Sequence, residues 1–311
     1  MSQLPSGFTL RRPELGDASA VLELQLAVEA ADYGDPESTL EDLLDQWKDI
    51  DLEQDAWLVY ASGGWLVGYG VVFKDDYGFM FDFYTHPNVA PDGLNAYLLA
   101  NCEQRARRLL AEDASLKPSA RTIIAHVNLA DGQSVEAARF AIRQYHFRMQ
   151  IDLESPPPPP EWTKGVMIRT ISPGLEDHRV YDLIQAAFER PGRIAPTFEN
   201  WRNYMMRPDH FSPDLWFLAF SGDELVGAAL CYDYPQHGWV RQLSVTQPWR
   251  RQGLGSALLR HSFGVFYRRG HKQVALGVSS QNPNAYSLYE GVGMRRVRQY
   301  DEYEKSLLEI R

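Results

Sequence analysis

A basic, glycine-spaced turn is the stretch of this sequence best suited to hold an anionic ligand. The sequence RRQGLG, at residues 250–255, follows a short apolar run that ends at Val245. Leu254, Leu258 and Leu259 lie at helical spacing, so the turn is expected to lead into a helix. The first amides of a helix lack internal partners and carry partial positive charge, and glycine lets a ligand approach the backbone. The turn therefore predicts a site for phosphate groups.

The bulk composition is that of an ordinary folded protein. The chain has 311 residues, enough for two domains, with 44% hydrophobic and 23% charged residues. Its formal net charge of -10 argues against general binding to nucleic acid, because phosphate backbones favour basic surfaces. No run approaches the roughly 18 apolar residues of a membrane span, and the N-terminus has no apolar stretch typical of a signal peptide. We therefore expect a cytoplasmic protein with no nucleic-acid or membrane partner.

The cysteines and histidines predict neither a disulfide framework nor a metal site. Cys102 lies in a helical pattern and Cys231 in a strand pattern, so both are expected in the core. The histidines have no acidic or cysteine partners at ligand spacing. The chain also lacks a Walker phosphate-binding motif and a GxSxG elbow. We expect no metal cofactor.

The two halves of the sequence repeat each other, which predicts a tandem of related domains. The segment Asp55–Gly68 matches Asp214–Gly227 at a constant spacing (214 − 55 = 159), and Gly93 matches Gly253 at a spacing of 160. Five consecutive prolines at residues 156–160 favour an extended, stiff conformation. The expected organisation is a first domain over residues 1–154, a proline-rich linker over 155–164 and a second domain over 165–311.

Each half predicts the same order of elements: a strand, two helices, three strands with tight turns, a long helix, a strand, a short helix and a terminal strand. In the first half the elements before the terminal strand are expected at residues 8–12, 18–31, 38–50, 57–61, 65–73, 79–85, 94–112, 122–127 and 134–144. In the second half they are expected at 166–171, 175–188, 198–207, 216–220, 225–232, 239–245, 254–269, 273–278 and 283–290. This order predicts a mixed α/β fold, with a mostly antiparallel sheet and helices on its faces.

Two motifs of the second half together resemble the GCN5-related N-acetyltransferases (GNAT). The first is the turn, which reads R-x-x-G-x-G from Arg250. The second is NPNAYSLY, from Asn282 to Tyr289, followed by Gly293 and Met294; it resembles N-x-x-A-x-x-L-Y and G-F, although Met294 replaces the usual aromatic residue. Either motif alone is weak, but the pair lies roughly thirty residues apart within the expected element order. The resemblance covers nearly all of residues 165–308.

The resemblance implies that the second half binds acetyl-CoA as a co-substrate. The turn would hold the pyrophosphate, the strand end would pair with the pantetheine arm, and Asn282 would bond the cofactor where two parallel strands separate. Tyr289 would protonate the departing CoA thiolate, because a phenol with a pKa of about 10 can match a thiolate of about 8.5; alternatively it is a packing tyrosine. The residues expected at the cofactor are Leu243, Val245, Arg250, Arg251, Gln252, Gly253, Gly255, Ser256, Asn282 and Tyr289.

The acceptor side of the site departs from the family. Many members use a carboxylate on the fourth strand to help deprotonate the amine, but residues 238–246 contain no Asp or Glu. Trp239 and Arg241 are expected to line the acceptor pocket with the loop at 189–197, and the arginine suits an acidic or phosphate-bearing substrate or pairs with a neighbour. The remaining candidates for a general base, each equally an ordinary surface or loop residue, are Asp233, His237, Asp301 and Glu302.

The first half departs further from the family. At a spacing of 160, Ala90 and Asn95 replace Arg250 and Gly255, and Asp92 adds a negative charge that would oppose pyrophosphate. Aligning His146-Phe147 with Gly293-Met294 gives a spacing of 147, which puts Ile142 opposite Tyr289 and Val135 opposite Asn282. We expect a degenerate domain that binds acetyl-CoA poorly or not at all and supports the second domain.

This pattern is similar to the tandem layout of the mycothiol synthases, but their substrate is not carried over because the acceptor side differs. We expect an acetyl-CoA-dependent N-acetyltransferase that acts on a small-molecule primary amine by direct attack in a ternary complex. The alternative is a non-catalytic protein that binds or senses acyl-CoA. The chain is expected to be a monomer or homodimer.

Overall fold

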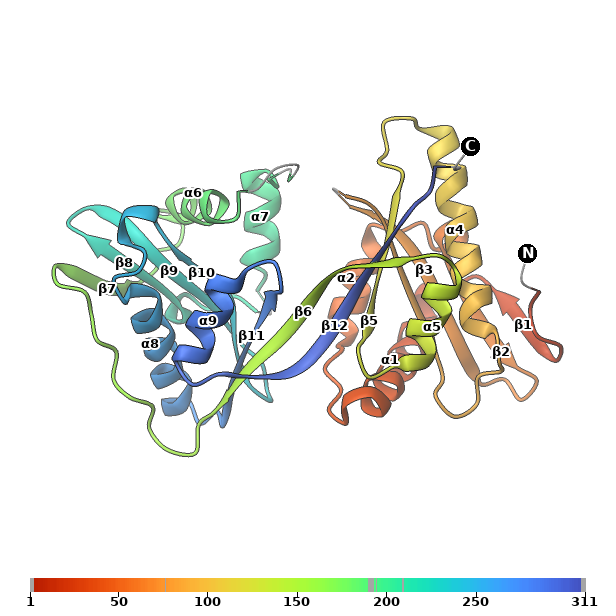
Figure 1. Cartoon of the computed structure of the whole chain (residues 1–311), viewed down its shortest axis with the longest axis horizontal. Helices are drawn as coiled ribbons and strands as arrows, with labels where there is room; N and C mark the ends of the chain where they lie inside the picture. The colour runs from red at the N-terminus through yellow and green to blue at the C-terminus, as the bar shows by residue number, and fades with distance from the viewer. Residues whose placement is uncertain (1–2, 76, 190–192, 194, 209, 309–311) are drawn as a thin grey trace. The chain divides into compact units, whose positions relative to one another are not determined.

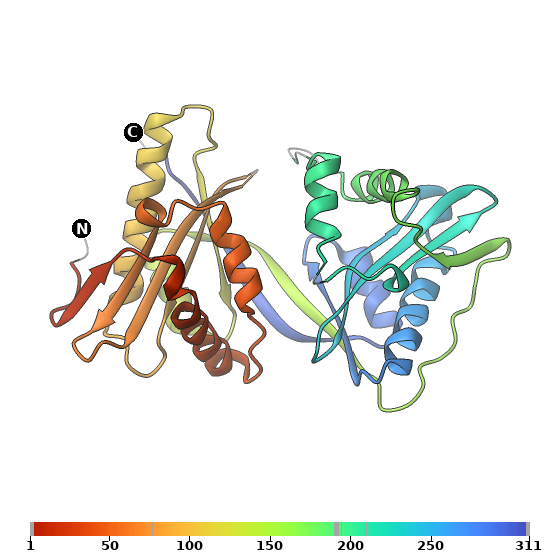
Figure 2. The same cartoon turned by 180° about the vertical axis from the view of Figure 1, so that it is seen from behind.

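The computed structural model describes residues 3–75, 77–189, 193, 195–208 and 210–308, and the chain forms two compact units (Figure 1 and Figure 2). Unit 1 comprises Met1–Tyr145 together with Arg298–Arg311, and unit 2 comprises His146–Val297. In each unit a mostly antiparallel sheet is flanked by helices, which confirms the predicted fold class. No helix among the described residues combines the length and the hydropathy needed to cross a bilayer.

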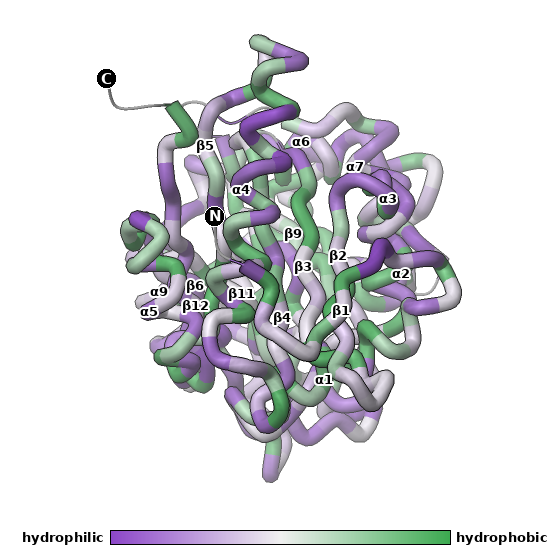
Figure 3. The backbone as a smooth tube through the Cα atoms, turned by 90° about the vertical axis from the view of Figure 1, so that its right-hand side faces the viewer, coloured by the Kyte–Doolittle hydropathy of each residue, from purple (hydrophilic) through white to green (hydrophobic). Residues whose placement is uncertain are grey.

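The sheet of unit 1 has the strand order β1-β2-β3-β4-β5-β12, in which the β4–β5 pair is parallel. The strands are β1 Phe8–Arg11, β2 Ala56–Ala61, β3 Leu66–Asp75, β4 Gly78–Thr85, β5 Ser119–Ala125 and β12 Arg295–Ser306. The helices are α1 Ala18–Tyr33, α2 Leu40–Lys48, α3 Leu52–Asp55, α4 Leu94–Glu112 and α5 Leu129–Ala137. Along α4, hydrophobic and hydrophilic residues alternate (Figure 3), as expected for a helix with one face on a sheet.

The sheet of unit 2 has the order β6-β11-β10-β9-β8-β7, and its β10–β11 pair is parallel. The strands are β6 Ala141–Asp152, β7 Val166–Thr170, β8 Trp216–Ser221, β9 Glu224–Asp233, β10 Gly238–Val245 and β11 Gln273–Ser279. The helices are α6 Asp177–Ala187, α7 Phe198–Met205, α8 Leu254–Arg268 and α9 Pro283–Gly291.

Two apolar layers separate the helices of unit 2 from its sheet. One layer contains Leu254, Leu258 and Phe263 of α8 with Tyr289 of α9, all buried. The other contains Val180 and Ile184 of α6, Trp201 of α7 and the opposite face of β8 and β9. We call these the α8 face and the α7 face. Because the side chains of a strand alternate between the two faces of the sheet, each residue of β10 can reach a ligand on only one of these faces.

The two units exchange their last strands, which differs from the expected domain boundaries at 154 and 165. Strand β12, late in the sequence, pairs with β5 of unit 1 from Tyr300–Ala125 to Ser306–Ser119. Strand β6, from the first half of the sequence, pairs with β11 of unit 2 from His146–Ser279 to Asp152–Gln273. A strand that completes a different sheet carries the same local pattern, so periodicity alone does not show the exchange.

The proline-rich segment over residues 155–164 therefore lies within unit 2 and joins β6 to β7, the first and last strands of that sheet. Trp162 packs against the α8 face and lies 5.6 Å from the ring of His261. The Thr163 hydroxyl donates a hydrogen bond to the Gln252 carbonyl at 3.0 Å. The segment is a strap across α8 rather than the link between the units.

The helix expected at residues 134–144 is displaced in the structure. Helix α5 begins at Leu129, because the Asn128 side chain accepts a hydrogen bond from the Asp131 amide and caps it. Arg139, at a φ of 66°, turns the chain, and β6 begins at Ala141. This difference changes the alignment between the two halves.

Candidate active site

The glycine turn in unit 2 adopts the conformation that its sequence predicts. Gly253 is the N-cap of α8 with a φ of 83°, in the left-handed region that favours glycine. Arg251 also has a positive φ, 60°, which is uncommon for a non-glycine residue. The backbone amides at the start of α8 have no acceptor within the helix, and they form the positive end of its dipole.

Side chains around the turn hold it in this shape. The Arg250 Nε atom donates to the Val245 carbonyl at 2.9 Å, and Gln252 Nε2 donates to the Pro248 carbonyl at 2.7 Å. A Cβ atom at Gly255 would approach Leu288 Cδ2 to 3.2 Å, which is tighter than most such contacts. Glycine at this position therefore lets α8 and α9 pack closely, and it leaves position 255 in the first turn of α8 without a side chain.

Beside this turn, β10 and β11 separate. Their parallel pairing is limited to Gly238–Val274 and Trp239–Ala275 among the described residues. Beyond this point β10 continues to Val245, paired with β9 alone. Leu243 and Val245 pack against the α8 face. The edge of β10 that faces β11 is thus open where the sequence predicts a pantetheine arm.

Asn282 and Tyr289 lie on α9, which packs on the same face. Asn282 is the N-cap of α9, and its Oδ1 atom accepts a hydrogen bond from the Ala285 amide at 3.2 Å. That bond uses the oxygen and leaves the Nδ2 donor for a ligand. Tyr289 is buried in the apolar layer, and burial raises the pKa of its hydroxyl to about 12. The phenol is therefore protonated at physiological pH, and it is a weaker acid than the free side chain.

Trp239 and Arg241 face the other side of the sheet. Trp239 packs against the α7 face, and the Arg148 guanidinium of β6 lies 5.5 Å from its ring. Arg241 Nη2 donates to the Tyr204 hydroxyl of α7 at 2.9 Å. Sequence reasoning missed Arg148 and Tyr204; no motif marks them, and Arg148 enters unit 2 only through the exchanged strand.

The candidate bases are dispersed. Asp233 pairs with Arg269 at 2.9 Å and with the His271 ring at 2.5 Å. His237 is buried beside Tyr234, whose ring centroid lies 5.5 Å away. Asp233 and His237 flank the turn between β9 and β10, and each has neighbours of its own.

Asp301 and Glu302 are placed in unit 1, which corrects their assignment to the second domain. Both lie on β12, where Asp301 bonds to His126 at 2.8 Å and Glu302 to Arg143 at 2.5 Å. On β5 they lie opposite Ile124 and Ile123 of unit 1. Of the loop at 189–197, residues 190–192 and 194 lie outside the described residues.

Unit 1 repeats the architecture of unit 2, at a spacing of 154 residues that corrects the value of 147. Asn128 and Asn282 both cap the short helix (282 − 128 = 154), and the positive-φ residues Arg139 and Gly293 have the same spacing. At this spacing Asn128 stands in the place of Asn282, and Val135 in the place of Tyr289. Ile142, the expected counterpart of Tyr289, lies instead on β6. Valine has no proton to donate.

A carboxyl group fills the corresponding part of unit 1. Asp131, in the place of Ala285, is buried and accepts hydrogen bonds from Asn128 Nδ2 at 3.0 Å and from Asn95 Nδ2. Asn95 replaces Gly255 at the start of α4. Burial and the nearby Asp32 charge raise the pKa of Asp131 to about 7. An acidic group and an asparagine thus occupy the place where unit 2 keeps alanine and glycine.

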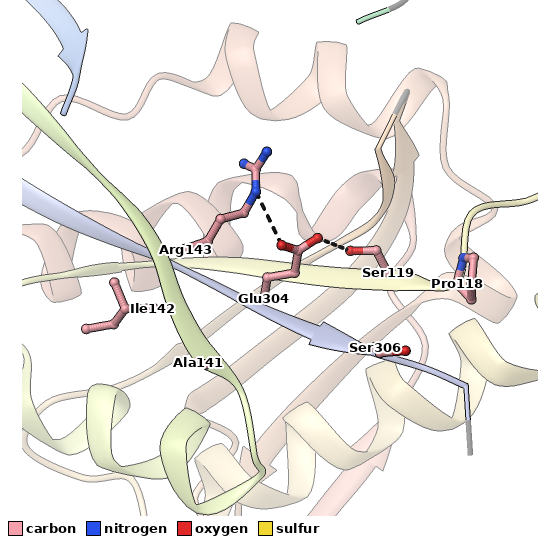
Figure 4. Close-up of a pocket in the computed structure, with 7 residues that line it drawn as sticks. All are labelled: Pro118, Ser119, Ala141, Ile142, Arg143, Glu304 and Ser306. Carbon is pink, nitrogen blue, oxygen red and sulfur yellow. Dashed lines mark hydrogen bonds and ion pairs between the residues drawn. The ribbon is translucent and has the colours of Figure 1, made fainter. Parts of the chain in front are cut away.

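Unit 1 also holds a cavity of about 440 Å³ (Figure 4). Figure 4 shows the Glu304 carboxylate between Arg143 and Ser119. Its lining residues are Pro118, Ser119, Ala141, Ile142, Arg143, Glu304 and Ser306, none of which belongs to the predicted site. Within the described ranges, no three His, Cys, Asp or Glu side chains are grouped as metal ligands would be.

Known proteins with similar sequences are acetyltransferases. Residues 178–294 match the family described as the Acetyltransferase (GNAT) family. A mycothiol acetyltransferase of Thermobispora bispora is 31% identical over 223 residues, which cover 68% of this chain and 71% of that protein.

Solved structures extend the likeness to the whole chain. A GCN5-related N-acetyltransferase from Sphaerobacter thermophilus superposes with a TM-score of 0.85 at 32% identity, covering 99% of this chain and 98% of that one. A tandem GNAT protein from the clavulanic acid biosynthesis pathway shares the fold, with a TM-score of 0.77 at 13% identity, covering 98% and 100%. The tandem layout and the resemblance inferred from the two motifs are confirmed.

Proposed function

Because the chain belongs to the GNAT family of acetyltransferases, we propose that unit 2 transfers the acetyl group of acetyl-CoA to the primary amine of a small molecule. The observation that carries this proposal is the convergence of three features on the α8 face: the glycine turn, the open edge of β10 and the buried Tyr289 hydroxyl. Together they match the phosphate, amide and thiolate groups of one ligand.

The fit of acetyl-CoA to these residues rests on the donors that the turn offers. The amides at the start of α8 and the charges of Arg250 and Arg251 suit pyrophosphate. Glycine at 255 leaves room for close approach, and the edge of β10 at Leu243 and Val245 suits the amides of pantetheine.

In the proposed reaction the amine attacks within a ternary complex. Its nitrogen forms a bond to the thioester carbonyl carbon, the carbon–sulfur bond breaks, and the amine proton leaves to solvent. The Tyr289 hydroxyl donates a hydrogen bond or its proton to the departing thiolate. No carboxylate lies on β10, so the amine must arrive in its neutral form or lose its proton to water.

Unit 1 is proposed as a supporting domain that does not bind acetyl-CoA. Asp131 places a carboxyl group where a cofactor would pass in unit 2, and Val135 supplies no proton. Several relatives are named mycothiol acetyltransferase, but their substrate is not carried over, because Trp239 and Arg241 are expected to line the acceptor side of this chain.

Release of CoA thiol across a panel of small amines tests the proposal. Turnover with at least one amine, and its reduction in Tyr289→Phe, are the expected results. Tight acetyl-CoA binding with no turnover for any amine would contradict it and favour a non-catalytic acyl-CoA-binding protein.

A further inference from the structure

A bulge in β10 distinguishes the acceptor side of unit 2 from the same region of unit 1. The β9–β10 register shifts between Val240, which lies opposite Cys231, and Gln242, which lies opposite Leu230, so Arg241 is the extra residue. In unit 1 the β3–β4 register runs without a shift from Gly68–Thr85 to Asp75–Gly78. The bulge therefore belongs to the unit with the predicted cofactor turn.

Arg241 lies on the α7 face, two positions after Trp239, as strand alternation places it. Trp239 packs on that face, and the Ser244 hydroxyl, three positions after Arg241, donates to the Leu183 carbonyl of α6. Arg241 reaches Tyr204 of α7, with its guanidinium 5.6 Å from the ring centroid. Its side chain is exposed, so a ligand can approach it from solvent.

A second guanidinium lies on the same tyrosine. Arg207 is also 5.6 Å from the Tyr204 ring centroid. Burial raises the pKa of the nearby Tyr232 hydroxyl, and the charges of Arg241 and Arg207 both oppose that rise. Among the residues that the structure describes, Arg241 takes part in no ion pair. The α7 face therefore carries the exposed positive charge of Arg241 beside Tyr204.

We infer that the acceptor is an amine that also carries an anionic group, a carboxylate or a phosphate, which binds to Arg241 at the bulge. The inference rests on the proposed function. A guanidinium offers paired donors with the geometry of either anion.

Matched pairs of amines test this inference. The probes are 4-aminobutyrate against 4-amino-1-butanol, for a carboxylate, and O-phosphoethanolamine against ethanolamine, for a phosphate. Wild-type kcat/KM should be about 10- to 100-fold higher for at least one anionic amine than for its neutral partner, as expected for a hydrogen bond to a charged group. The pair with the larger ratio identifies the anion.

Variants assign the preference to Arg241. Arg241→Gln should raise KM for the anionic amine about tenfold or more and raise KM for the neutral amine much less. Arg241→Lys should restore part of the loss. The charge-matched control is Arg295→Gln, an exposed residue of unit 2 that pairs with Asp152. Equal kcat/KM within both pairs, or equal loss in the control, overturns the inference.

Binding separates this inference from the proposed function. If no amine is acetylated, the proposed function fails, and the affinity of each probe for the protein in the presence of CoA is measured by calorimetry. Tighter binding of an anionic amine that Arg241→Gln removes still supports the anion site. Equal binding of charged and neutral probes contradicts it.

Discussion

Replacing Tyr289 with phenylalanine removes one oxygen atom from the α8 face and tests the role of that hydroxyl. The hydroxyl forms no hydrogen bond among the described residues, and burial is the sole cause of its raised pKa of about 12. Phenylalanine should fit the same space, so the thermal unfolding temperature should change little. Any loss of turnover can then be assigned to chemistry.

The magnitude of that loss follows from the two pKa values. Full proton transfer from a phenol with a pKa of about 12 to a thiolate of about 8.5 is uphill by roughly 5 kcal/mol. The hydroxyl therefore acts mainly through a hydrogen bond to the developing thiolate, worth about 1.5–3 kcal/mol. Tyr289→Phe should lower kcat by about 10- to 100-fold, below the thousandfold effects that full acid catalysis can reach.

The assay is release of CoA thiol at saturating acetyl-CoA from pH 6 to 10. The raised pKa predicts no alkaline loss of activity from Tyr289 in this range. Tyr286→Phe, on the same helix and in edge-to-face contact with Phe147 at 5.6 Å between ring centroids, is the matched control and should retain wild-type kcat. Unchanged turnover in Tyr289→Phe, or an equal loss in Tyr286→Phe, would refute the assignment.

Three further outcomes follow from the structure. Gly255→Ala brings a methyl group to 3.2 Å from Leu288 and should lower kcat/KM about tenfold. Gly264→Ala in the same helix should leave kcat/KM unchanged, because its methyl group meets only the flexible end of Arg268. Steady-state kinetics compares the two variants. The absence of a carboxylate on β10 predicts that kcat/KM rises with pH toward the pKa of each amine used; a plateau near pH 7 shared by amines of different pKa would reveal an enzymic base. Burial raises the pKa of Asp82 in the folded protein to about 6, so its ionisation costs stability as the pH rises from the unfolded value of about 4 to 6. Asp82→Asn should therefore raise the free energy of unfolding above pH 6 by at most about 3 kcal/mol and have no effect near pH 3. Urea unfolding at both pH values measures the change, and equal effects at the two would contradict the reasoning.

The glycine turn is the part of the proposed site whose local structure sequence predicted best. Glycine at 253 and the apolar spacing of α8 are local signals, and the structure gives both the cap and the helix. The open edge of β10 was expected at Leu243 and Val245, and the parallel pairing with β11 does end at Trp239. The bulge at Arg241 has no comparable signal, because a single inserted residue does not disturb the apolar pattern on either side.

The long-range features escaped prediction because no local pattern encodes them. The exchange of β6 and β12 changes which sheet each strand completes while leaving its side-chain alternation intact. Because of this exchange, Asp301 and Glu302 belong to unit 1, and Arg148 belongs to unit 2. The displaced α5 is a different error: the capping side chain of Asn128 outweighs the helical spacing that continues beyond Ala137.

The strand exchange also decides how the central claim is tested. A fragment that ends at residue 154 lacks β12, and one that begins at 165 lacks β6, so the whole chain must be used. Titrating acetyl-CoA into the whole chain by calorimetry should give one site per chain. Gly255→Val should abolish that site, while the matched change Asn95→Val in unit 1 should leave it intact. Two sites per chain, or a single site lost in Asn95→Val and retained in Gly255→Val, would contradict the claim that unit 2 alone binds the cofactor.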